Sequence, residues 1–444
     1  MRIQWSLLAL LVFVPSTHAQ NNNNNNNGNA GGIAIDARGV VETTVTRKES
    51  PAAARKRQSE FVRNQLQPGI VVTTPRRVLS LKELEKQVAA ALEAGNSIPI
   101  SLQGMCGINR LDEVILDFDA ADVLIAGPAE GFAPDSEGRL VGVESGRPTM
   151  LLDDLVIGLR TAYARDPTMG CSIDPTDDNM ARLQDYLRQN STVTSTAGAA
   201  QRYRVMAQVL GPQNIRLWGA PRDTHAAMVL VEADLRMKRI SLGVEQSGVK
   251  GIRSQLSLLK PQGNSLQRWW FVPKYNPIQA NAKRDLFTIS GPRVKLLAQE
   301  EYSNASGQRF DAAVTRDSTE EFAKLFTEHY AKLAEVRPVF ADLQNVFDLA
   351  VLGALIKQEG LDVQADWPMA TFLNDPALPL AHYANPQYVS SMSTSRLAGN
   401  VMLGLVGGVT LDPRPTVQVQ VDNNLPTPPE VSRESQSLFW DFAQ

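Results

Sequence analysis

The chain has 444 residues, of which 43% are hydrophobic and 20% are charged. This composition excludes a wholly disordered chain, and the length corresponds to roughly two or three folded domains. The 44 basic and 47 acidic side chains give a formal net charge of −3. A balance this mild predicts no strongly charged partner and no nucleic-acid binding.

The N-terminus has the three parts of a secretory signal peptide. Arg2 supplies a positive charge, Trp5 to Val14 is mostly apolar, and Thr17 and Ala19 fit a cleavage site. The apolar run is about ten residues, whereas spanning a bilayer takes roughly twenty. We therefore expect cleavage after Ala19 and export to the periplasm, the envelope or the exterior, with an uncleaved anchor as the alternative. We expect no transmembrane segment in the mature chain, since the best later candidate, Leu349 to Ile356, is short.

A polar tract and a basic stretch follow. Seven asparagines, Asn21 to Asn27, precede several glycines, which predicts a disordered spacer over residues 20–46. Residues 47–77 contain eight Lys/Arg side chains, and Ser50 and Pro51 favour the start of a helix there. This basic helical arm has two interpretations: it contacts an anionic envelope or wall component, or it is a solvated helical face.

From residue 78 onward, helix and strand patterns are mixed. Ser80 and Glu83 form a capping box at the start of a helix. Val114–Phe118 and Val123–Ala126 flank a turn and predict a β-hairpin, and Leu151–Tyr163 has a helical pattern. Because no regular strand–helix–strand rhythm emerges, the predicted fold class is α+β.

Residues 225–238 are ambiguous between strand and helix. Apolar and polar residues alternate in the second half of the segment, as in a strand. The residue types nevertheless favour a helix, and Asp223 or Thr224 can cap it. Two acid–base pairs have the i,i+4 spacing of helical ion pairs: Glu232 with Arg236 and Asp234 with Lys238. We expect a helix.

The C-terminal part predicts two neighbouring helices. Ser318 and Glu321 form a capping box for a helix that runs to about Glu335. Pro338 starts a second helix, whose apolar residues as far as Leu355 form one wide face. The short break between them predicts a helical hairpin.

The last hundred residues contain three further signals. The Gly-rich run Val401–Thr410 predicts a tight pair of strands, and the prolines of residues 425–429 predict a stiff linker. The aromatic tail, residues 438–442, is expected to tuck against the body rather than dock a partner. The predicted division is a signal peptide (1–19), spacer (20–46), basic helical arm (47–77), two α+β domains (78–195 and 196–316), a helical hairpin plus strands (317–424), and a linker with an aromatic tail (425–444).

No cofactor or metal motif withstands inspection. Gly243 to Lys250 resembles a phosphate-binding loop, but a valine separates the second glycine from the lysine. The mature chain has three histidines, His225, His329 and His382, without metal-ligand spacing. We therefore expect no cofactor and no metal. An even cysteine count in an exported chain suggests a disulfide between Cys106 and Cys171, with two buried thiols as the alternative.

One group of side chains forms a candidate catalytic site: Asp223, His225, Glu232 and Asp234. Asp223 can orient His225, and a nearby carboxylate can share acid–base work. If the segment is helical, Asp223 is instead a helix cap and the other two carboxylates belong to surface ion pairs. No nucleophile or oxyanion donor is identifiable from the sequence.

Several segments together resemble an uncharacterised family of exported planctomycete proteins that share a domain of unknown function. The resemblance covers roughly residues 75–412 and implies export, without an activity or catalytic residues to carry over. The matching segments are VLIAGPAEGF (123–132), GCSIDPT (170–176), DTH (223–225), VEADLRMK (231–238), QRWWFVP (267–273) and PVFADLQNVFD (338–348).

The sequence therefore favours a non-catalytic envelope or extracellular protein that acts through contacts. Two alternatives stay open. One is an exported hydrolase with a non-local site around His225. The other is a module for a wall polymer or carbohydrate that stacks on Trp218, Trp269 and Trp270, for which core burial is the competing interpretation.

Overall fold

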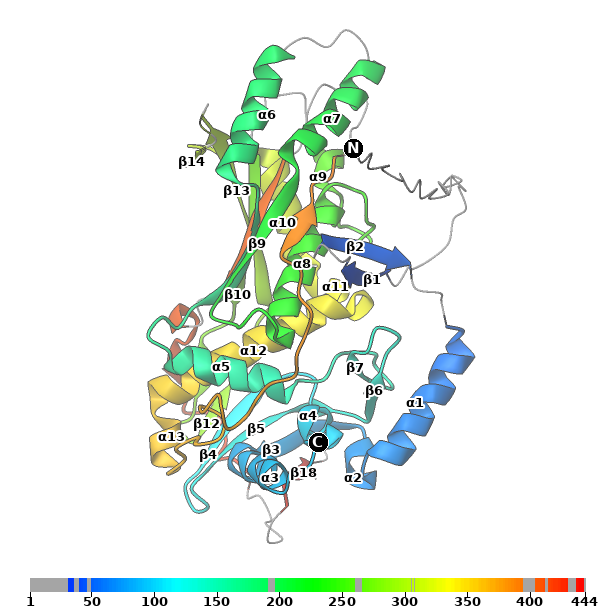
Figure 1. Cartoon of the computed structure of the whole chain (residues 1–444). Helices are drawn as coiled ribbons and strands as arrows, with labels where there is room; N and C mark the ends of the chain where they lie inside the picture. Colours follow the sequence, from blue (N-terminus) through cyan, green and yellow to red (C-terminus); the bar gives the residue numbers. More distant parts are fainter. Residues whose placement is uncertain are drawn as a thin grey trace, which may run out of the picture.

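Two mixed β-sheets lie at opposite ends of the molecule, with helices α5 and α12 between them (Figure 1). The computed structural model describes residues 31–35, 40–45, 49–190, 196–259, 266–304, 306, 308–393, 404–411, 414–429 and 437–442. The predicted signal peptide (1–19) and the asparagine run lie outside the described residues. The mixture of helices and mixed sheets confirms the α+β class.

The larger sheet has nine strands and is antiparallel except at the β2–β15 and β10–β16 pairs. In spatial order its strands are β1 (Gly31–Ile35), β2 (Val40–Val45), β15 (Tyr388–Ser390), β9 (Pro212–Trp218), β8 (Met169–Asp174), β16 (Gly404–Leu411), β10 (Leu266–Lys274), β13 (Arg293–Ser303) and β14 (Arg309–Asp311).

The second sheet has seven strands, and only its β11–β17 pair is parallel. Its strands in spatial order are β17 (Val419–Val421), β11 (Ile278–Ala280), β12 (Leu286–Thr288), β4 (Glu113–Asp117), β5 (Asp122–Ala129), β3 (Thr74–Ser80) and β18 (Phe439–Phe442). A separate hairpin joins β6 (Phe132–Pro134) to β7 (Leu140–Gly142). Each sheet combines strands from distant parts of the chain, so the predicted boundaries at 195/196 and 316/317 do not separate the sheets.

The helices cover the sheets and fill the space between them (Figure 1). They are α1 (Pro51–Gln65), α2 (Pro68–Val71), α3 (Leu81–Glu93), α4 (Ile100–Gln103), α5 (Leu152–Tyr163), α6 (Asp177–Gln189), α7 (Thr196–Leu210), α8 (His225–Ser241), α9 (Gln255–Leu258), α10 (Asp317–Glu328), α11 (Tyr330–Val336), α12 (Pro338–Glu359) and α13 (Leu361–Gln364), with 3-10 turns at Met105–Gly107 and Arg414–Thr416.

Helix α12 is the central element of the fold. Every residue from Val339 to Ile356 is buried. Its first half packs with α8 and the nine-stranded sheet, and its second half packs with α3, α5 and the seven-stranded sheet. The predicted single apolar face was therefore wrong, because this helix has core on all sides.

Helix α12 is also long and apolar enough to cross a membrane by length and composition, but that apolar stretch is buried inside the protein. The sequence expectation that no later segment reaches this length was wrong, because the apolar run extends well before Leu349. Burial of this kind is that of a core helix rather than one exposed to lipid.

Two glycines let α5 and α12 approach closely. A Cβ atom on Gly158 of α5 would lie 2.6 Å from the carbonyl oxygen of Leu349. A Cβ atom on Gly353 of α12 would lie 2.7 Å from the carbonyl oxygen of Gly158. Because backbone atoms occupy both positions, no side-chain rearrangement can make room for a larger residue.

Local sequence signals predicted several helices and strands correctly. Ser80 caps α3, and its hydroxyl accepts a 2.9 Å hydrogen bond from the backbone N–H of Glu83. The predicted hairpin is β4–β5, and the ambiguous segment is helix α8. Its N-cap is Thr224, whose hydroxyl accepts from the N–H of Ala227.

The structure of the predicted spacer and of the basic arm differs in part from the sequence-based expectation. Residues 31–35 and 40–45 of the spacer form the antiparallel strands β1 and β2, consistent with the β-branched residues of β2. Ser50 caps α1, which has no buried residue. Arg76 and Arg77, however, belong to β3. Arg77 is fully buried and donates to both carboxylate oxygens of Asp441 at 2.7 and 2.8 Å. These two arginines therefore stabilise the sheet and are not part of a basic surface.

The predicted helical hairpin is shorter than expected. Helix α10 packs mainly on β13 and contacts α12 through the rings of Phe326 and Phe340, whereas α11 packs along the start of α12, with the Tyr330 hydroxyl donating to the Phe340 carbonyl at 3.0 Å. Ser318 is not the cap of α10. Glu300 of β13 accepts hydrogen bonds from Thr319 and from the N–H of Arg316, so a tertiary contact replaces the local cap.

Two predictions for the C-terminal part have opposite outcomes. The tail does tuck against the body, because β18 pairs with β3 and forms the edge of the seven-stranded sheet. The predicted Gly-rich strand pair at 401–410 was wrong. Residues 404–411 form the single strand β16, whose partners are the distant strands β8 and β10.

The predicted disulfide is absent. Cys106 and Cys171 are not bonded to each other, and they belong to two different hydrophobic clusters. Burial raises the pKa of the Cys106 thiol to about 12, with the charge of Arg77 opposing this. The thiol form is therefore favoured, and the alternative of buried thiols describes these positions better.

We expect Gly353→Ala to destabilise the protein by about 1–3 kcal/mol, because the new methyl group overpacks the α5–α12 crossing. Intrinsic helix propensity alone predicts the opposite sign. The matched control is Gly198→Ala at an exposed position of α7, where alanine should be neutral or stabilising. Urea unfolding measures both changes, and equal effects would contradict the proposed crossing.

Candidate functional site

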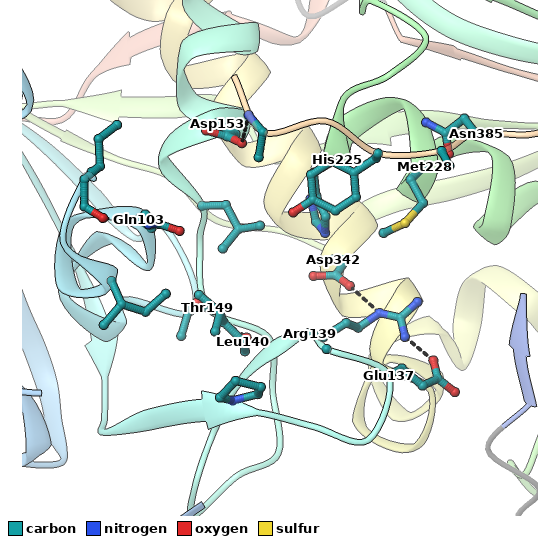
Figure 2. Close-up of a pocket in the computed structure, with 18 of the residues that line it drawn as sticks. Gln103, Glu137, Arg139, Leu140, Thr149, Asp153, His225, Met228, Asp342 and Asn385 are labelled. Atoms are coloured by element: carbon teal, nitrogen blue, oxygen red, sulfur yellow. Dashed lines mark hydrogen bonds and ion pairs between the residues drawn. The ribbon is translucent and has the colours of Figure 1, made fainter. Parts of the chain in front are cut away.

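A cavity of about 880 Å³ lies where α5, α8 and α12 meet the β6–β7 hairpin. Figure 2 shows the polar group on one side, with His225 and Asp342 close together, and Gln103 on the far side. The segment 379–386 forms another wall of the cavity. The main apolar residues that line the cavity are Leu92, Ile98, Ile100, Leu140, Leu151, Met228 and Val231.

His225 is the first residue of α8 and is held by Asp154 of α5. Its Nδ1 lies 2.8 Å from Asp154 Oδ2, and both side chains are buried. Burial alone would lower the pKa of His225, but the charge and hydrogen bond of Asp154 outweigh it and raise the pKa to about 9. His225 is therefore a cation at neutral pH. Its Nε2 makes no hydrogen bond within the described part of the chain.

Asp342 lies in the second turn of α12 and is bonded to Arg139. Arg139 Nε donates to Asp342 Oδ2 at 3.0 Å. Burial raises the pKa of Asp342 to about 6, although the charges of His225 and Arg139 oppose this. The carboxyl group therefore changes its protonation state close to neutral pH. Its Oδ1 has no hydrogen-bond donor among the described residues.

Arg139 is the centre of a carboxylate network. Its three nitrogens donate to Asp342, Glu137 and Glu232, one to each carboxylate (Figure 2 draws the first two). Burial would lower the pKa of Arg139, but these carboxylates raise it above its ordinary value. Glu232 also accepts from Arg236 at 2.7 Å. The network therefore fixes the positions of Arg139 and its three carboxylate partners, all of which line the cavity.

The segment 379–386 closes one side of the cavity and is attached to α5 and α8. Asp153 Oδ2 accepts from the backbone N–H of Ala381 at 3.1 Å, and burial raises the pKa of Asp153. The ring of Tyr383 packs edge-on against His225, with centroids 5.3 Å apart. Burial and the surrounding aspartates raise the pKa of Tyr383 to about 12.

The structure brings together two of the four residues that the sequence singled out. His225 and Glu232 line the cavity. Asp223 does not orient His225, because it lies on the surface and pairs with the exposed His382 at 2.8 Å. Asp234 pairs with Lys238 at 2.6 Å in a buried site away from the cavity. The predicted i,i+4 ion pairs form, but in the interior rather than on the surface.

Sequence reasoning missed Asp154, Asp342 and Arg139, which complete the site around His225. A usable signal existed for Asp342, because it is a carboxylate inside the long apolar run of residues 339–355. A buried carboxylate is costly unless a partner compensates it. No local signal connects Asp154 or Arg139 with His225, since they lie 71 and 86 residues away in the sequence.

The proposed stacking surface of three tryptophans does not assemble as one face. Trp269 is fully buried and packs edge-on against Phe322. Trp218 and Trp270 are partly buried on the separate strands β9 and β10. In the described ranges there is no group of three or more His, Cys, Asp or Glu side chains that could hold a metal ion.

One segment of the chain, which carries part of this site, matches a family of unknown function. Residues 171–255 match the family described as "Protein of unknown function (DUF1598)". The match extends from β8 through α8 and includes His225 and Glu232, whereas Arg139, Asp154 and Asp342 lie outside it. No curated protein and no solved structure matches the chain. This part of the chain is therefore similar to a domain whose function is not known.

The raised pKa of His225 predicts a pH-dependent contribution to stability. The contribution is complete below the ordinary pKa of 6.5 and is lost as the pH rises through about 9. Its size is about 3 kcal/mol, the free energy that corresponds to this difference in pKa. The stability advantage of the wild type over His225→Gln should therefore shrink between pH 6 and pH 10 in urea unfolding.

The matched control is His382→Gln, because His382 is mostly exposed and should contribute little at any pH. If the advantage over His225→Gln were the same at pH 6 and pH 10, the ion pair with Asp154 would not hold a proton on His225.

Proposed function

We propose that the protein is an exported hydrolase whose active site is the cavity around His225. One observation carries the proposal: an acid and a base of adjusted pKa line the same cavity. His225, with a pKa of about 9, keeps its proton at neutral pH, and Asp342, with a pKa of about 6, has mostly lost its own. Both groups thus hold the protonation state that general acid–base catalysis requires.

In the proposed reaction a water molecule attacks the substrate directly, with Asp342 as the base and His225 as the acid. Asp342 Oδ1 takes a proton from a water molecule as the water oxygen bonds to the substrate. His225 Nε2 gives its proton to the leaving group as the old bond breaks. Solvent then returns the proton from Asp342 to His225. Asp154 and Arg139 act as positioning residues, because each fixes one of the two reacting side chains.

This proposal differs from the contact role that the sequence favoured. That interpretation depended on the lack of a coherent active site in the sequence, whereas the non-local pairs Asp154–His225 and Arg139–Asp342 support the proposal of one. No candidate nucleophile is needed, because a water molecule serves in that role.

The test is a panel of chromogenic esters, amides, glycosides and phosphate esters. We expect hydrolysis of one bond class, with a rate that rises as the pH passes about 6 and falls beyond about 9. His225→Gln and Asp342→Asn should each lower kcat/KM by at least about 100-fold, and Asp342→Asn should also remove the acidic limb. His382→Gln is the control and should keep full activity. Activity that survives His225→Gln would refute the proposal.

A contact role for helix α1 is the second candidate function. Arg55, Lys56 and Arg63 are exposed on this surface helix, which has no buried residue. Basic side chains in this arrangement favour an anionic envelope polymer.

Charge reversal at Arg55, Lys56 and Arg63 should weaken binding to a teichoic-acid-like polyphosphate at low salt and remove its salt dependence. The control reverses Lys324 and Lys332, which are exposed on α10 and α11. Equal losses in both variants, measured by co-sedimentation, would leave α1 as an ordinary solvated helix.

A further inference from the structure

The side chains that line the cavity carry more negative than positive charge. Four carboxylates line it: Glu137, Asp153, Glu232 and Asp342. Two lining groups, Arg139 and the protonated His225, are cationic. Behind them, Asp154 is paired with His225, and Glu245 is paired with Arg236 and Arg239. At neutral pH the side chains around the cavity therefore carry a net negative charge.

The cations of the cavity already face carboxylates. Every nitrogen of Arg139 donates to a carboxylate, whereas Asp154 binds only Nδ1 of His225 and leaves Nε2 without a bond among the described residues. An anionic ligand on Nε2 would lie close to Asp342, whose charge acts on His225, and one on Arg139 would have to displace a carboxylate. Either arrangement is unfavourable in a partly desolvated site, where charges are weakly screened.

Two carboxylates retain an oxygen for a ligand. Asp342 is 3% exposed and uses Oδ2 for Arg139, so Oδ1 has no hydrogen-bond donor among the described residues. Asp153 uses Oδ2 for the N–H of Ala381, which leaves its Oδ1 likewise without a donor. Both side chains line the same cavity. Asp342 is buried and Asp153 is half-buried, and an acceptor without a donor in such a site favours a ligand that supplies one.

The side of the cavity next to α3 and α4 carries no charged side chain. Leu92, Ile98 and Ile100 come from these helices and the turn between them, together with the polar residues Asn96, Ser97 and Gln103, and Leu140 and Leu151 extend the apolar surface. Figure 2 shows Gln103 of α4 opposite the group of His225 and Asp342, so the charged and uncharged regions lie apart. A ligand that fills the cavity therefore contacts both regions.

We infer that the ligand of this cavity is an amphipathic amine, whose ammonium group binds Oδ1 of Asp342 and whose apolar body lies against α3 and α4. The inference rests on the proposed function only for the location of the site. An ammonium on Oδ1 of Asp342 occupies the atom that would take the proton from water, so the amine is a ligand that competes with the hydrolysed substrate. An ammonium group supplies three donors and one positive charge, which satisfies the unused oxygen of Asp342 and offsets part of the negative charge. A neutral alcohol satisfies the oxygen but not the charge, and a carboxylate does neither.

Three compounds with one carbon skeleton test this: 4-phenylbutylamine, 4-phenylbutanol and 4-phenylbutyrate, titrated calorimetrically into the full chain at pH 7.5. We expect the amine to bind at least about tenfold more tightly than the alcohol, because a charged hydrogen bond replaces a neutral one. The butyrate should not bind measurably. Tighter binding of the alcohol or the butyrate would overturn the inference, and so would no binding of any of the three.

Asp342→Asn should lower the affinity for the amine by about tenfold or more and leave the alcohol unchanged. Asp223→Asn is the matched control, since Asp223 lies on the surface with His382 and does not line the cavity. If Asp342→Asn does not fold, as judged by circular dichroism, Asp153→Asn is the second test. An amine affinity that neither aspartate variant changes would overturn the inference.

The outcomes also separate this inference from the proposed hydrolase. Charge-selective binding that depends on Asp342, without hydrolysis that depends on His225, supports the amine site and refutes the enzyme. Hydrolysis that depends on His225, together with a preference for 4-phenylbutanol or 4-phenylbutyrate, supports the enzyme and refutes the amine.

Discussion

The fold depends on compensating the polar side chains of a helix that has no solvent-facing side. Helix α12 is buried from Val339 to Ile356, and it carries Asp342, Gln344, Asn345 and Asp348 within that stretch. A buried polar group without a partner costs about 1–3 kcal/mol, and an unpaired charge costs more. Each of the four therefore requires a partner from another element.

These partners connect α12 with segments far away in the sequence. Asp342 accepts a hydrogen bond from Arg139, and Gln344 accepts one from Arg147. Asn345 donates to the carbonyl of Pro148. The β6–β7 hairpin and the loop after it are thereby fixed along one side of the helix. On another side, Asp348 accepts from Arg293 and from the hydroxyl of Tyr275, both at 2.7 Å. The same requirement that stabilises the core thus places Arg139 at the cavity.

The sequence predicted those parts of the fold that depend on local physics. The cap at Ser80 and the turn between β4 and β5 each involve residues a few positions apart, so a single chain segment contains the whole signal. Strand pairing of β16 with β8 joins residues more than 200 positions apart. The Gly-rich composition of residues 401–410 indicated strand, but nothing in that segment identified its partners.

The candidate site was predictable only in part for the same reason. His225 and Glu232 were found because they are close in the sequence and on one helix. Asp223 was chosen as the partner of His225 because it is also close, yet consecutive residues around a helix start point in different directions. Asp154 reaches His225 because glycine contacts bring α5 against α12, which in turn packs on α8. That geometry has no local signature.

A comparison of the buried charged groups distinguishes a functional site from structural ion pairs, since both perturb pKa values. Arg77 is surrounded by carbonyl oxygens and by Asp441, and each of its nitrogens donates to at least one of them. Arg293 is likewise bonded to Asp348, Asp112 and the Leu111 carbonyl. Neither arginine lines the cavity.

His225 and Asp342 differ from these arginines in two respects. Each uses one polar atom for a partner that orients it and leaves the other, Nε2 or Oδ1, without a bond among the described residues. Both also line a cavity large enough for a small molecule. Structural stability alone favours complete pairing. An oriented acid and an oriented base that each keep one atom for a ligand are the arrangement that binding and catalysis require.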